Sequence, residues 1–217
     1  MKYQIIPSVI AKNQKELDLR LQKVFSLSNV IQLDVMDGKL VKNRSFMFNF
    51  KLQKFKFNKS KKNKSKVYEA HLMMQNPLNW IKKHASKVNL IIIHAESNNL
   101  EQSIKLIQNK NKTLGIALNP KTSVNSLIPY LNQVNQVTIL SVNPGKYGSK
   151  FIPKTLNKVK QLRKLKPKLN IEIDGGLGSK HIIQAKRAGA NKFVSGSYLQ
   201  TSKNIKSDFK ILKKLIK

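Results

Sequence analysis

Short apolar runs alternate with amphipathic segments along the whole chain. Eight runs rich in Val, Ile and Leu have the length and spacing of β-strands: Tyr3–Ile10, Val30–Asp34, Val67–Leu72, Leu90–His94, Leu114–Leu118, Val137–Val142, Asn170–Asp174 and Lys192–Ser195. The clearest segments between them show helical periodicity with Lys, Gln and Asn on the outer face: Gln14–Phe25, Pro77–Lys87, Leu100–Asn109, Ser123–Leu131, Lys154–Leu165, Lys180–Ala188 and Ile205–Ile216. After the second strand the pattern is weaker, with an irregular helix at Phe46–Phe57 and a Lys/Asn/Ser loop at Asn58–Lys66.

Eight strand–helix units in 217 residues predict an α/β protein, a (β/α)₈ barrel near the small end of its usual length. A doubly wound open sheet is the alternative, although such a sheet rarely needs eight strands. No linker or shift in composition divides the chain, so residues 1–217 are expected to form one barrel domain.

Composition excludes several classes of protein. The chain has no cysteine, which rules out disulfides, thiolate metal sites and cysteine nucleophiles. It has no apolar run of about 18 residues, so no membrane span is expected. The apolar stretch at the N-terminus is too short for a signal peptide, and we expect a cytoplasmic protein.

The chain is strongly basic, with 42 Lys and Arg against 10 Asp and Glu and a formal net charge of +32. Only four of the cations are Arg, the residue that reads nucleic acid through paired hydrogen bonds. We therefore attribute the high Lys and Asn content to drift on solvated faces rather than to selection for a specific nucleic-acid partner. The Lys-rich segment Lys59–Lys66 is interpreted in the same way. The field still attracts anions, including phosphorylated metabolites.

Polar residues gather where the predicted strands end, the edge at which a barrel carries its active site. Asp34 and Asp174 continue the inward alternation of their strands, and a carboxylate there is costly unless it is paired or bound to metal. With His71 they make a plausible site for Zn²⁺, Fe²⁺ or Mn²⁺. His94 also ends a strand, whereas Asp37 suits a loop brace.

Other residues near these strand ends have simpler interpretations. Met36 and Met73 are expected to fill the core, and His84 and His181 to lie on helix surfaces. Glycine turns follow the last three strands, a place where barrels often bind phosphate through backbone N–H groups. Their residues are Gly145, Gly148, Gly175, Gly176, Gly196 and Ser197.

At these positions the chain resembles the ribulose-phosphate 3-epimerase family, from Ile6-Pro7-Ser8 to Gly196-Ser197. The matching motifs are Leu33-Asp34-Val35-Met36-Asp37-Gly38, His71-Leu72-Met73, His94-Ala95-Glu96, Ala117-Leu118-Asn119-Pro120, Ser141-Val142-Asn143-Pro144-Gly145, Lys150-Phe151-Ile152-Pro153, Glu172-Ile173-Asp174-Gly175-Gly176 and Val194-Ser195-Gly196-Ser197. Their number, order and spacing make the resemblance specific.

The resemblance implies a cytosolic barrel enzyme that interconverts D-ribulose 5-phosphate and D-xylulose 5-phosphate in the pentose phosphate pathway. It implies one divalent metal ion, Zn²⁺, Fe²⁺, Mn²⁺ or Mg²⁺, and a homo-oligomer. By the same resemblance Asp34 and Asp174 are acid/base and metal-binding residues, and His71 is a metal ligand that also meets substrate. The remaining substrate contacts implied are Ser8, Gly145, Gly148, Gly175, Gly176, Gly196 and Ser197.

The sequence departs from the family pattern at three places. Gln32 stands where the family has its second histidine ligand, which implies weaker metal binding or a preference shifted towards Mn²⁺ or Mg²⁺. In the loop after the sixth strand Tyr147 replaces a glycine that contacts phosphate, while Lys146 could supply a cation there. Leu140 replaces a methionine of similar volume.

Two further functions stay open at this stage. A related 3-epimerase acting on a six-carbon ketose such as allulose 6-phosphate needs only a longer pocket. A catalytically decayed basic barrel could instead bind polyanions. The Asp-x-Lys-x-x-Asp signature of hexulose-phosphate synthase and orotidylate decarboxylase does not occur at the corresponding strand ends.

Overall fold

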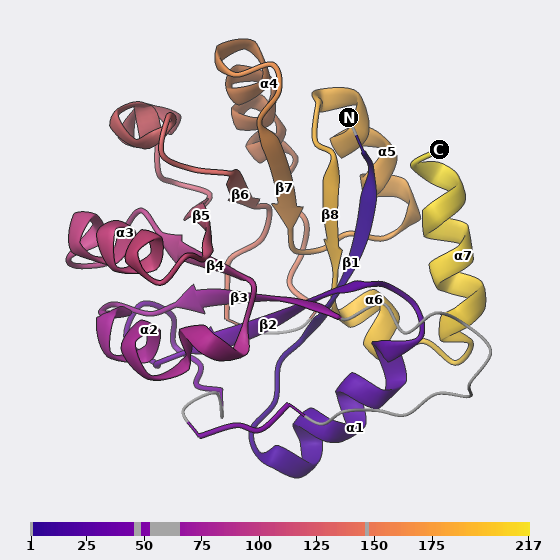
Figure 1. Cartoon of the computed structure of the whole chain (residues 1–217). Helices are drawn as coiled ribbons and strands as arrows, with labels where there is room; N and C mark the ends of the chain where they lie inside the picture. The colour runs from indigo at the N-terminus through magenta and orange to yellow at the C-terminus, as the bar shows by residue number, and fades with distance from the viewer. Residues whose placement is uncertain (1, 46–48, 53–65, 146–147) are drawn as a thin grey trace.

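The computed structural model describes residues 2–45, 49–52, 66–145 and 148–217, and its eight parallel strands close into a barrel (Figure 1). Each strand pairs with its neighbours in sequence, and the last pairs with the first. This confirms the predicted (β/α)₈ barrel. The strands are β1 Gln4–Val9, β2 Val30–Met36, β3 Val67–Met73, β4 Leu90–His94, β5 Thr113–Leu118, β6 Gln136–Leu140, β7 Asn170–Asp174 and β8 Lys192–Ser195.

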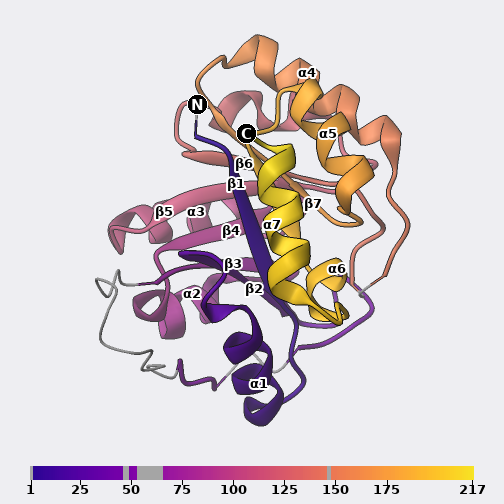
Figure 2. The same cartoon turned by 90° about the vertical axis from the view of Figure 1, so that its right-hand side faces the viewer.

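Helices cover the outside of the barrel wherever the described chain forms them. The α-helices are α1 Gln14–Phe25, α2 Leu78–His84, α3 Leu100–Asn109, α4 Leu156–Leu165, α5 Ser179–Ala188, α6 Ser197–Gln200 and α7 Ile205–Leu215. Short 3₁₀ helices lie at η1 Ala85–Lys87, η2 Val124–Tyr130 and η3 Pro153–Thr155. Figure 2 shows α7 running beside β1, which brings both termini to the same end of the barrel.

One predicted helix differs from the structure and one observed helix was not predicted, each for an identifiable reason. The segment predicted as a helix at Ser123–Leu131 forms the 3₁₀ helix η2, which contains Pro129. The proline ring clashes with the carbonyl four residues before it in an α-helix, which disfavours that conformation here. The helix α6 was not predicted. Its four residues directly follow β8 and are too few to show a helical period in the sequence.

The main hydrophobic core lies between the sheet and the helices. Side chains alternate along each strand, so Leu33 and Val35 of β2 point outwards into this core beside Leu17 and Leu21 of α1. The residues between them point into the barrel, where the buried apolar side chains form only small clusters such as Ile6, Val30 and Val194. Much of the barrel interior is therefore polar.

The layer of the barrel interior below the strand ends contains buried charge. Glu69 of β3 lies 3.6 Å from Nζ of Lys192 on β8, measured to Oε2. Glu172 of β7 accepts a hydrogen bond from Thr138 Oγ1 at 2.9 Å, and Gln136 accepts one from Lys192 Nζ. Both glutamates are buried, and Oε2 of Glu172 and both carboxylate oxygens of Glu69 have no hydrogen-bond partner.

Strand register brings the predicted site residues together above this layer. Asp34 of β2 pairs with His71 of β3, and Leu140 of β6 pairs with Asp174 of β7. Both aspartates therefore reach the carboxyl end of the barrel on opposite sides of its interior, as inward alternation predicts. Within the described ranges no helix is long and apolar enough to span a membrane.

Candidate active site

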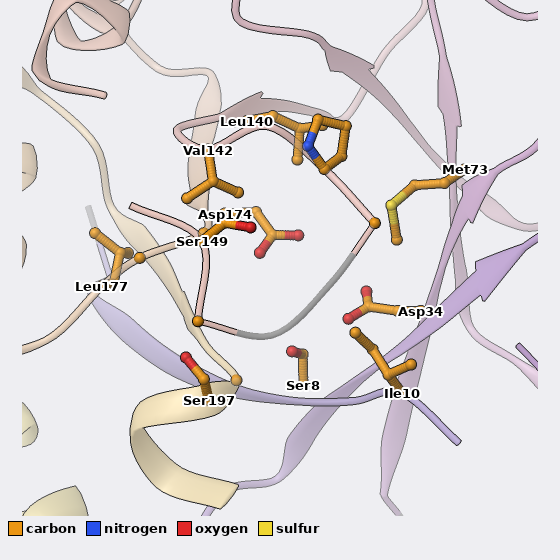
Figure 3. A pocket seen from close by; sticks show the side chains of 16 residues that line it. Ser8, Ile10, Asp34, Met73, Leu140, Val142, Ser149, Asp174, Leu177 and Ser197 are labelled. Atoms are coloured by element: carbon orange, nitrogen blue, oxygen red, sulfur yellow. The ribbon is translucent and has the colours of Figure 1, made fainter. Parts of the chain in front are cut away.

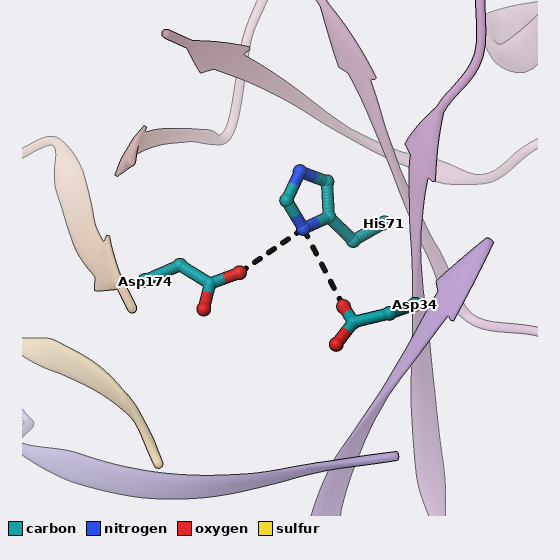
Figure 4. Close-up of side chains that lie close together, drawn as sticks. All are labelled: Asp34, His71 and Asp174. Atoms are coloured by element: carbon teal, nitrogen blue, oxygen red, sulfur yellow. Dashed lines mark hydrogen bonds and ion pairs between the residues drawn. The ribbon is translucent and has the colours of Figure 1, made fainter. Parts of the chain in front are cut away.

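Asp34, His71 and Asp174 surround one point at the carboxyl end of the barrel. Nδ1 of His71 lies 3.0 Å from Oδ2 of Asp174 and 3.5 Å from Oδ1 of Asp34, as the dashed lines of Figure 4 show. One ligand atom from each residue lies within 4.8 Å of the others. We call these three residues the acidic cage. The two carboxylates approach the imidazole from different sides of the barrel, which is the arrangement that the sequence predicts.

The acidic cage strongly changes the protonation of its members. Burial alone would lower the pKa of His71, but hydrogen bonds and charge attraction from Asp174 and Asp34 raise it to about 10. Burial and repulsion from Asp174 raise the pKa of Asp34, against the opposing effect of His71. The cage therefore carries a compensating positive charge on the imidazole, in the place where a cation would otherwise balance the carboxylates.

Gln32 lies two residues before Asp34 on β2, so its side chain also points into the barrel. It fills the centre of the acidic cage. Its Nε2 donates to Oδ1 of Asp34 and to Oδ2 of Asp174, both at 2.8 Å. The same nitrogen lies 3.5 Å from Nδ1 of His71, and the amide oxygen Oε1 is buried without a hydrogen-bond partner. The amide nitrogen thus faces both carboxylates, whereas a metal ligand at this residue would have to present the oxygen.

A second histidine and a glutamate extend the cage on its far side. Nε2 of His71 lies 3.0 Å from Nε2 of His94, and Nδ1 of His94 lies 3.0 Å from Oε2 of Glu96. The other oxygen of Glu96 accepts hydrogen bonds from the backbone N–H of Asn119 at 2.9 Å and from Thr122 Oγ1. The sequence assigned no role to His94 or Glu96. Their spacing of two residues at a strand end was the available signal, since alternation turns both to one side.

A cavity opens beside the two aspartates (Figure 3). Asp34, Met73 and Ile10 lie towards one side in the figure, and Ser197 and Leu177 towards the other. The lining includes both aspartates and every other predicted substrate contact except His71: Ser8, Gly145, Gly148, Gly175, Gly176, Gly196 and Ser197. His71 is completely buried beneath the aspartates.

The turn after β7 requires glycine for both conformation and space. Gly175 has φ +110°, and a Cβ built on it would lie 2.4 Å from Cγ2 of Val142. Ser141 holds the same turn by donating its hydroxyl to the backbone oxygens of Asp174 at 3.0 Å and Gly175 at 2.7 Å. These contacts fix the backbone that carries Asp174 into the cavity.

Met36, Met73 and Asp37 have the surroundings that the sequence predicts. Met36 and Met73 pack together in a small buried cluster, as predicted. Asp37 accepts hydrogen bonds from the backbone N–H groups of Lys39, Leu40 and Gln75, which confirms it as a loop brace.

The prediction that His84 and His181 lie on helix surfaces is wrong. His84 is buried against Phe50 and Trp80, with ring centroids 5.6 Å and 5.3 Å away, because Phe50 from the segment after β2 packs on this face of α2. His181 is half-buried and stacks on Phe151 with ring centroids 4.3 Å apart. Its Nδ1 lies 2.8 Å from the backbone oxygen of Gly176, so it supports the glycine turn from behind.

Three sequence interpretations concern residues outside the described ranges. Lys146 and Tyr147 fall within the loop after β6, of which the structure describes Gly145 and Gly148 on either side. The irregular helix expected at Phe46–Phe57 and the loop at Lys59–Lys66 also fall largely outside those ranges.

The fold and the site together define a class of protein, a (β/α)₈ barrel enzyme with two carboxylates facing a small-molecule cavity at the carboxyl end of its strands. Residues 4–200 match the ribulose-phosphate 3 epimerase family. The chain belongs to this family, and it is therefore an isomerase that acts on a carbohydrate.

Individual relatives agree with that assignment. A ribulose-phosphate 3-epimerase from Buchnera aphidicola subsp. Baizongia pistaciae is 36% identical over 210 residues, covering 94% of this chain and 91% of the relative. The cytoplasmic isoform of ribulose-phosphate 3-epimerase from Oryza sativa subsp. japonica is 32% identical over 201 residues, covering 89% and 85%.

Solved structures of lower sequence identity share the architecture. The crystal structure of KGPDC from Streptococcus mutans superposes with a TM-score of 0.72 at 14% identity, covering 100% of this chain and 98% of the other. A likeness at this identity supports the fold, whereas the reaction has to be argued from the site.

Proposed function

We propose that this chain is a metal-dependent epimerase that inverts C3 of a ketopentose phosphate and interconverts D-ribulose 5-phosphate and D-xylulose 5-phosphate. One observation carries the proposal: Asp34 and Asp174 approach the same point from opposite strands, with an imidazole between them and an open cavity in front. Inversion of a carbon needs one proton-transfer group on each face of a planar intermediate, and this arrangement provides two.

The donor atoms of the cage suit a divalent cation. Two carboxylate oxygens and one imidazole nitrogen are the ligands that Zn²⁺, Fe²⁺ and Mn²⁺ accept, and the donor atoms lie within 4.8 Å of one another. Asp34, His71 and Asp174 would hold the ion, and Gln32 would have to turn its unpaired Oε1 inwards to join them. When bound, the cation supplies positive charge at the ketone oxygen of the substrate and so makes the neighbouring C–H more acidic.

The two aspartates would carry the proton transfers. In one direction Asp34 removes the proton from C3 on its face, leaving a planar enediolate, and Asp174 delivers a proton to the other face. In the reverse direction the roles exchange. Burial raises the pKa of Asp34, which brings this base closer to neutral pH and makes its transfer of a proton more effective.

The glycine turns would bind the phosphate and hold the sugar in register. Gly175 and Gly176 follow β7, and Gly196 and Ser197 follow β8, so both turns line the same cavity as the aspartates. Backbone N–H groups in such turns bind phosphate without a charged side chain. Binding energy from the phosphate would position C3 between the carboxylates, and Ser8, which lines the same cavity, would contact the sugar.

The decisive experiment measures epimerisation of D-ribulose 5-phosphate in a coupled assay with and without EDTA. We expect turnover that EDTA abolishes and that added Zn²⁺ or Mn²⁺ restores. Asp34→Asn and Asp174→Asn should each reduce kcat by roughly three decades, because each removes one proton-transfer group but preserves the shape of the site. Near-normal turnover by either purified variant would refute the two-aspartate scheme.

Two alternatives predict different results in the same assay. A six-carbon 3-epimerase would show a higher kcat/KM for D-allulose 6-phosphate than for the pentose phosphate. A polyanion-binding barrel would turn over neither sugar and would bind RNA at physiological salt. The ratio of the two kcat/KM values decides between the two enzymes.

The setting of the enzyme is also proposed. We propose a cytoplasmic location within the pentose phosphate pathway, supported by the Oryza sativa relative that is named as a cytoplasmic isoform. We propose a homo-oligomer without a specific nucleic-acid partner, and light scattering at physiological salt measures its mass. The expected single barrel domain over residues 1–217 predicts one cooperative unfolding transition.

A further inference from the structure

A continuous row of hydrogen-bonding groups runs from the acidic cage towards the surface. His71 contacts His94, His94 contacts Glu96, and Glu96 contacts Asn119 and Thr122. Both histidine side chains are completely buried, whereas the Glu96 side chain is 21% exposed. The proton transfers described above use neither His94 nor Glu96.

The two imidazoles meet edge to edge rather than face to face. Their planes differ by 5° and their centroids lie 5.1 Å apart, yet the two Nε2 atoms are only 3.0 Å apart. The centroid separation exceeds the nitrogen separation by about the sum of two ring radii, which requires the nitrogens to point at one another. One proton must therefore lie between them, because two N–H groups or two lone pairs at this distance would repel.

Glu96 determines where that proton belongs. An ionised carboxylate only accepts hydrogen bonds, so Nδ1 of His94 must carry a hydrogen and donate it to Oε2. A neutral His94 then has only a lone pair on Nε2, and His71 must donate its own Nε2–H to it. The second hydrogen of the charged His71 therefore lies on Nδ1, next to Asp34 and Asp174, and Nδ1 is the nitrogen that offers a lone pair once a cation replaces that hydrogen.

We propose that His94 and Glu96 are positioning residues that fix the tautomer of His71, so that its Nδ1 offers a lone pair to a divalent cation held with Asp34 and Asp174. The inference rests on the proposed metal site and deepens it. Partners of this kind orient a metal-binding histidine, and their loss typically weakens metal binding 10- to 100-fold.

The surroundings of Glu96 make one substitution unusually informative. The Asn119 N–H donates to Oε1 at 2.9 Å, so in Glu96→Gln the amide oxygen stays at that position and the NH₂ group takes the place of Oε2. The amide then donates to Nδ1 of His94 and moves the hydrogen of His94 to Nε2. His71 must accept it there with a lone pair on Nε2, so the single hydrogen of His71 stays on Nδ1, where it blocks a cation.

A second substitution, Glu96→Ala, tests whether Glu96 has only a structural role. It removes more contacts than Glu96→Gln, but it leaves His94 free to adopt either tautomer. We expect 10- to 100-fold weaker Mn²⁺ and Zn²⁺ binding by the purified apo Glu96→Gln protein and a smaller loss for Glu96→Ala. If Glu96 only supports the loop, Glu96→Ala should show the larger loss. Glu101→Gln makes the same chemical change at an exposed position on α3 and should bind both metals as the unmodified chain does.

A second measurement does not depend on metal. In ¹⁵N spectra of the apo protein, His94 should carry its hydrogen on Nδ1 in the unmodified chain and in Glu101→Gln, and on Nε2 in Glu96→Gln. An unchanged tautomer in Glu96→Gln, or a loss of metal affinity in Glu96→Ala that equals or exceeds the loss in Glu96→Gln, overturns the proposal. If the unmodified chain binds neither metal, the metal site itself fails and the proposal falls with it, whereas the ¹⁵N spectra still report whether Glu96 sets the tautomer of His94.

Discussion

Gln32 is one of the three positions at which the sequence departs from the family pattern described above. Its amide nitrogen lies 2.8 Å from a carboxylate oxygen of each aspartate and therefore occupies the space between the ligand atoms. A cation entering the cage must displace this N–H donor, and the hydrogen bonds it breaks reduce the net gain in free energy. Gln32 would thus compete with a metal ion for the same oxygens.

Replacement of this amide by an imidazole should improve the site. Gln32→His removes the competing donor and adds a nitrogen ligand, so we expect tighter binding of Zn²⁺ than in the unmodified chain and a smaller gain for Mn²⁺. Titration of apo protein with each metal against a chromophoric chelator measures both. Unchanged affinity for both metals would place residue 32 outside the coordination of the ion.

Single residues also mark the limit of what the sequence predicts. Asp34, His71 and Asp174 could be identified because each lies at or near the carboxyl end of a strand and points inwards. Gln32 could be placed beside them, but not the direction of its amide, since that depends on contacts with two other strands. His181 was misjudged because a helical period shows which face is apolar, not that Phe151 from a distant loop covers it.

At the scale of elements, the sequence predicts the bounds of the strands better than the structure of the segments that connect them. Leu90–His94, Asn170–Asp174 and Lys192–Ser195 have the predicted bounds, because buried parallel strands are continuous apolar runs. The strand β6 ends at Leu140, two residues before the predicted end, where Ser141 turns to hold the backbone after β7. A contact between residues that are distant in the sequence leaves no pattern in the residues around either of them.

The turn after β7 offers a test of how an element positions the site. Gly175→Ala puts a methyl group 2.4 Å from Cγ2 of Val142 at φ +110°, a conformation that alanine rarely adopts. We expect a loss of about 1–3 kcal/mol in the free energy of unfolding. We also expect a raised KM, because the turn moves away from the phosphate. Urea unfolding and steady-state kinetics measure the two effects.

The double variant Gly175→Ala, Val142→Ala provides the matched control. It removes the two valine methyl groups that the added side chain would contact but leaves the backbone strain. Partial recovery of stability is expected. A single Gly175→Ala variant with unchanged stability and unchanged KM would show that the turn tolerates a side chain and would refute the steric argument.

At the scale of the whole molecule, the interior of the barrel couples its stability to pH. Burial and repulsion from Glu69 hold the pKa of Glu172 well above its usual value, although Lys192 opposes them. The folded state therefore keeps a proton that the unfolded chain releases near pH 4.5. The stabilising contribution is complete below that pH and is lost as pH rises towards the raised pKa of the folded state.

Glu172→Gln removes this dependence, because an amide of similar shape does not ionise. Between pH 5 and pH 8 the unmodified chain should lose stability relative to Glu172→Gln, by about 1 kcal/mol for each pH unit below the raised pKa. Urea midpoints at the two pH values measure the difference, and comparison between the variants cancels the effect of the large net charge. Glu101→Gln, which is exposed, should follow the unmodified chain, and parallel curves for all three would contradict the prediction.

The cage draws Asp34 and His71 from the first half of the sequence and Asp174 from the second half. No half of the barrel therefore contains all three proposed ligands, and the proposed ion site needs the pairing of β1 with β8 that closes the barrel. Any cation that binds there favours the closed form and raises the apparent free energy of unfolding by RT ln(1 + [M]/Kd). The thermal midpoint of the protein should accordingly rise with the concentration of free metal, so that closure of the ring and competence for catalysis are thermodynamically linked.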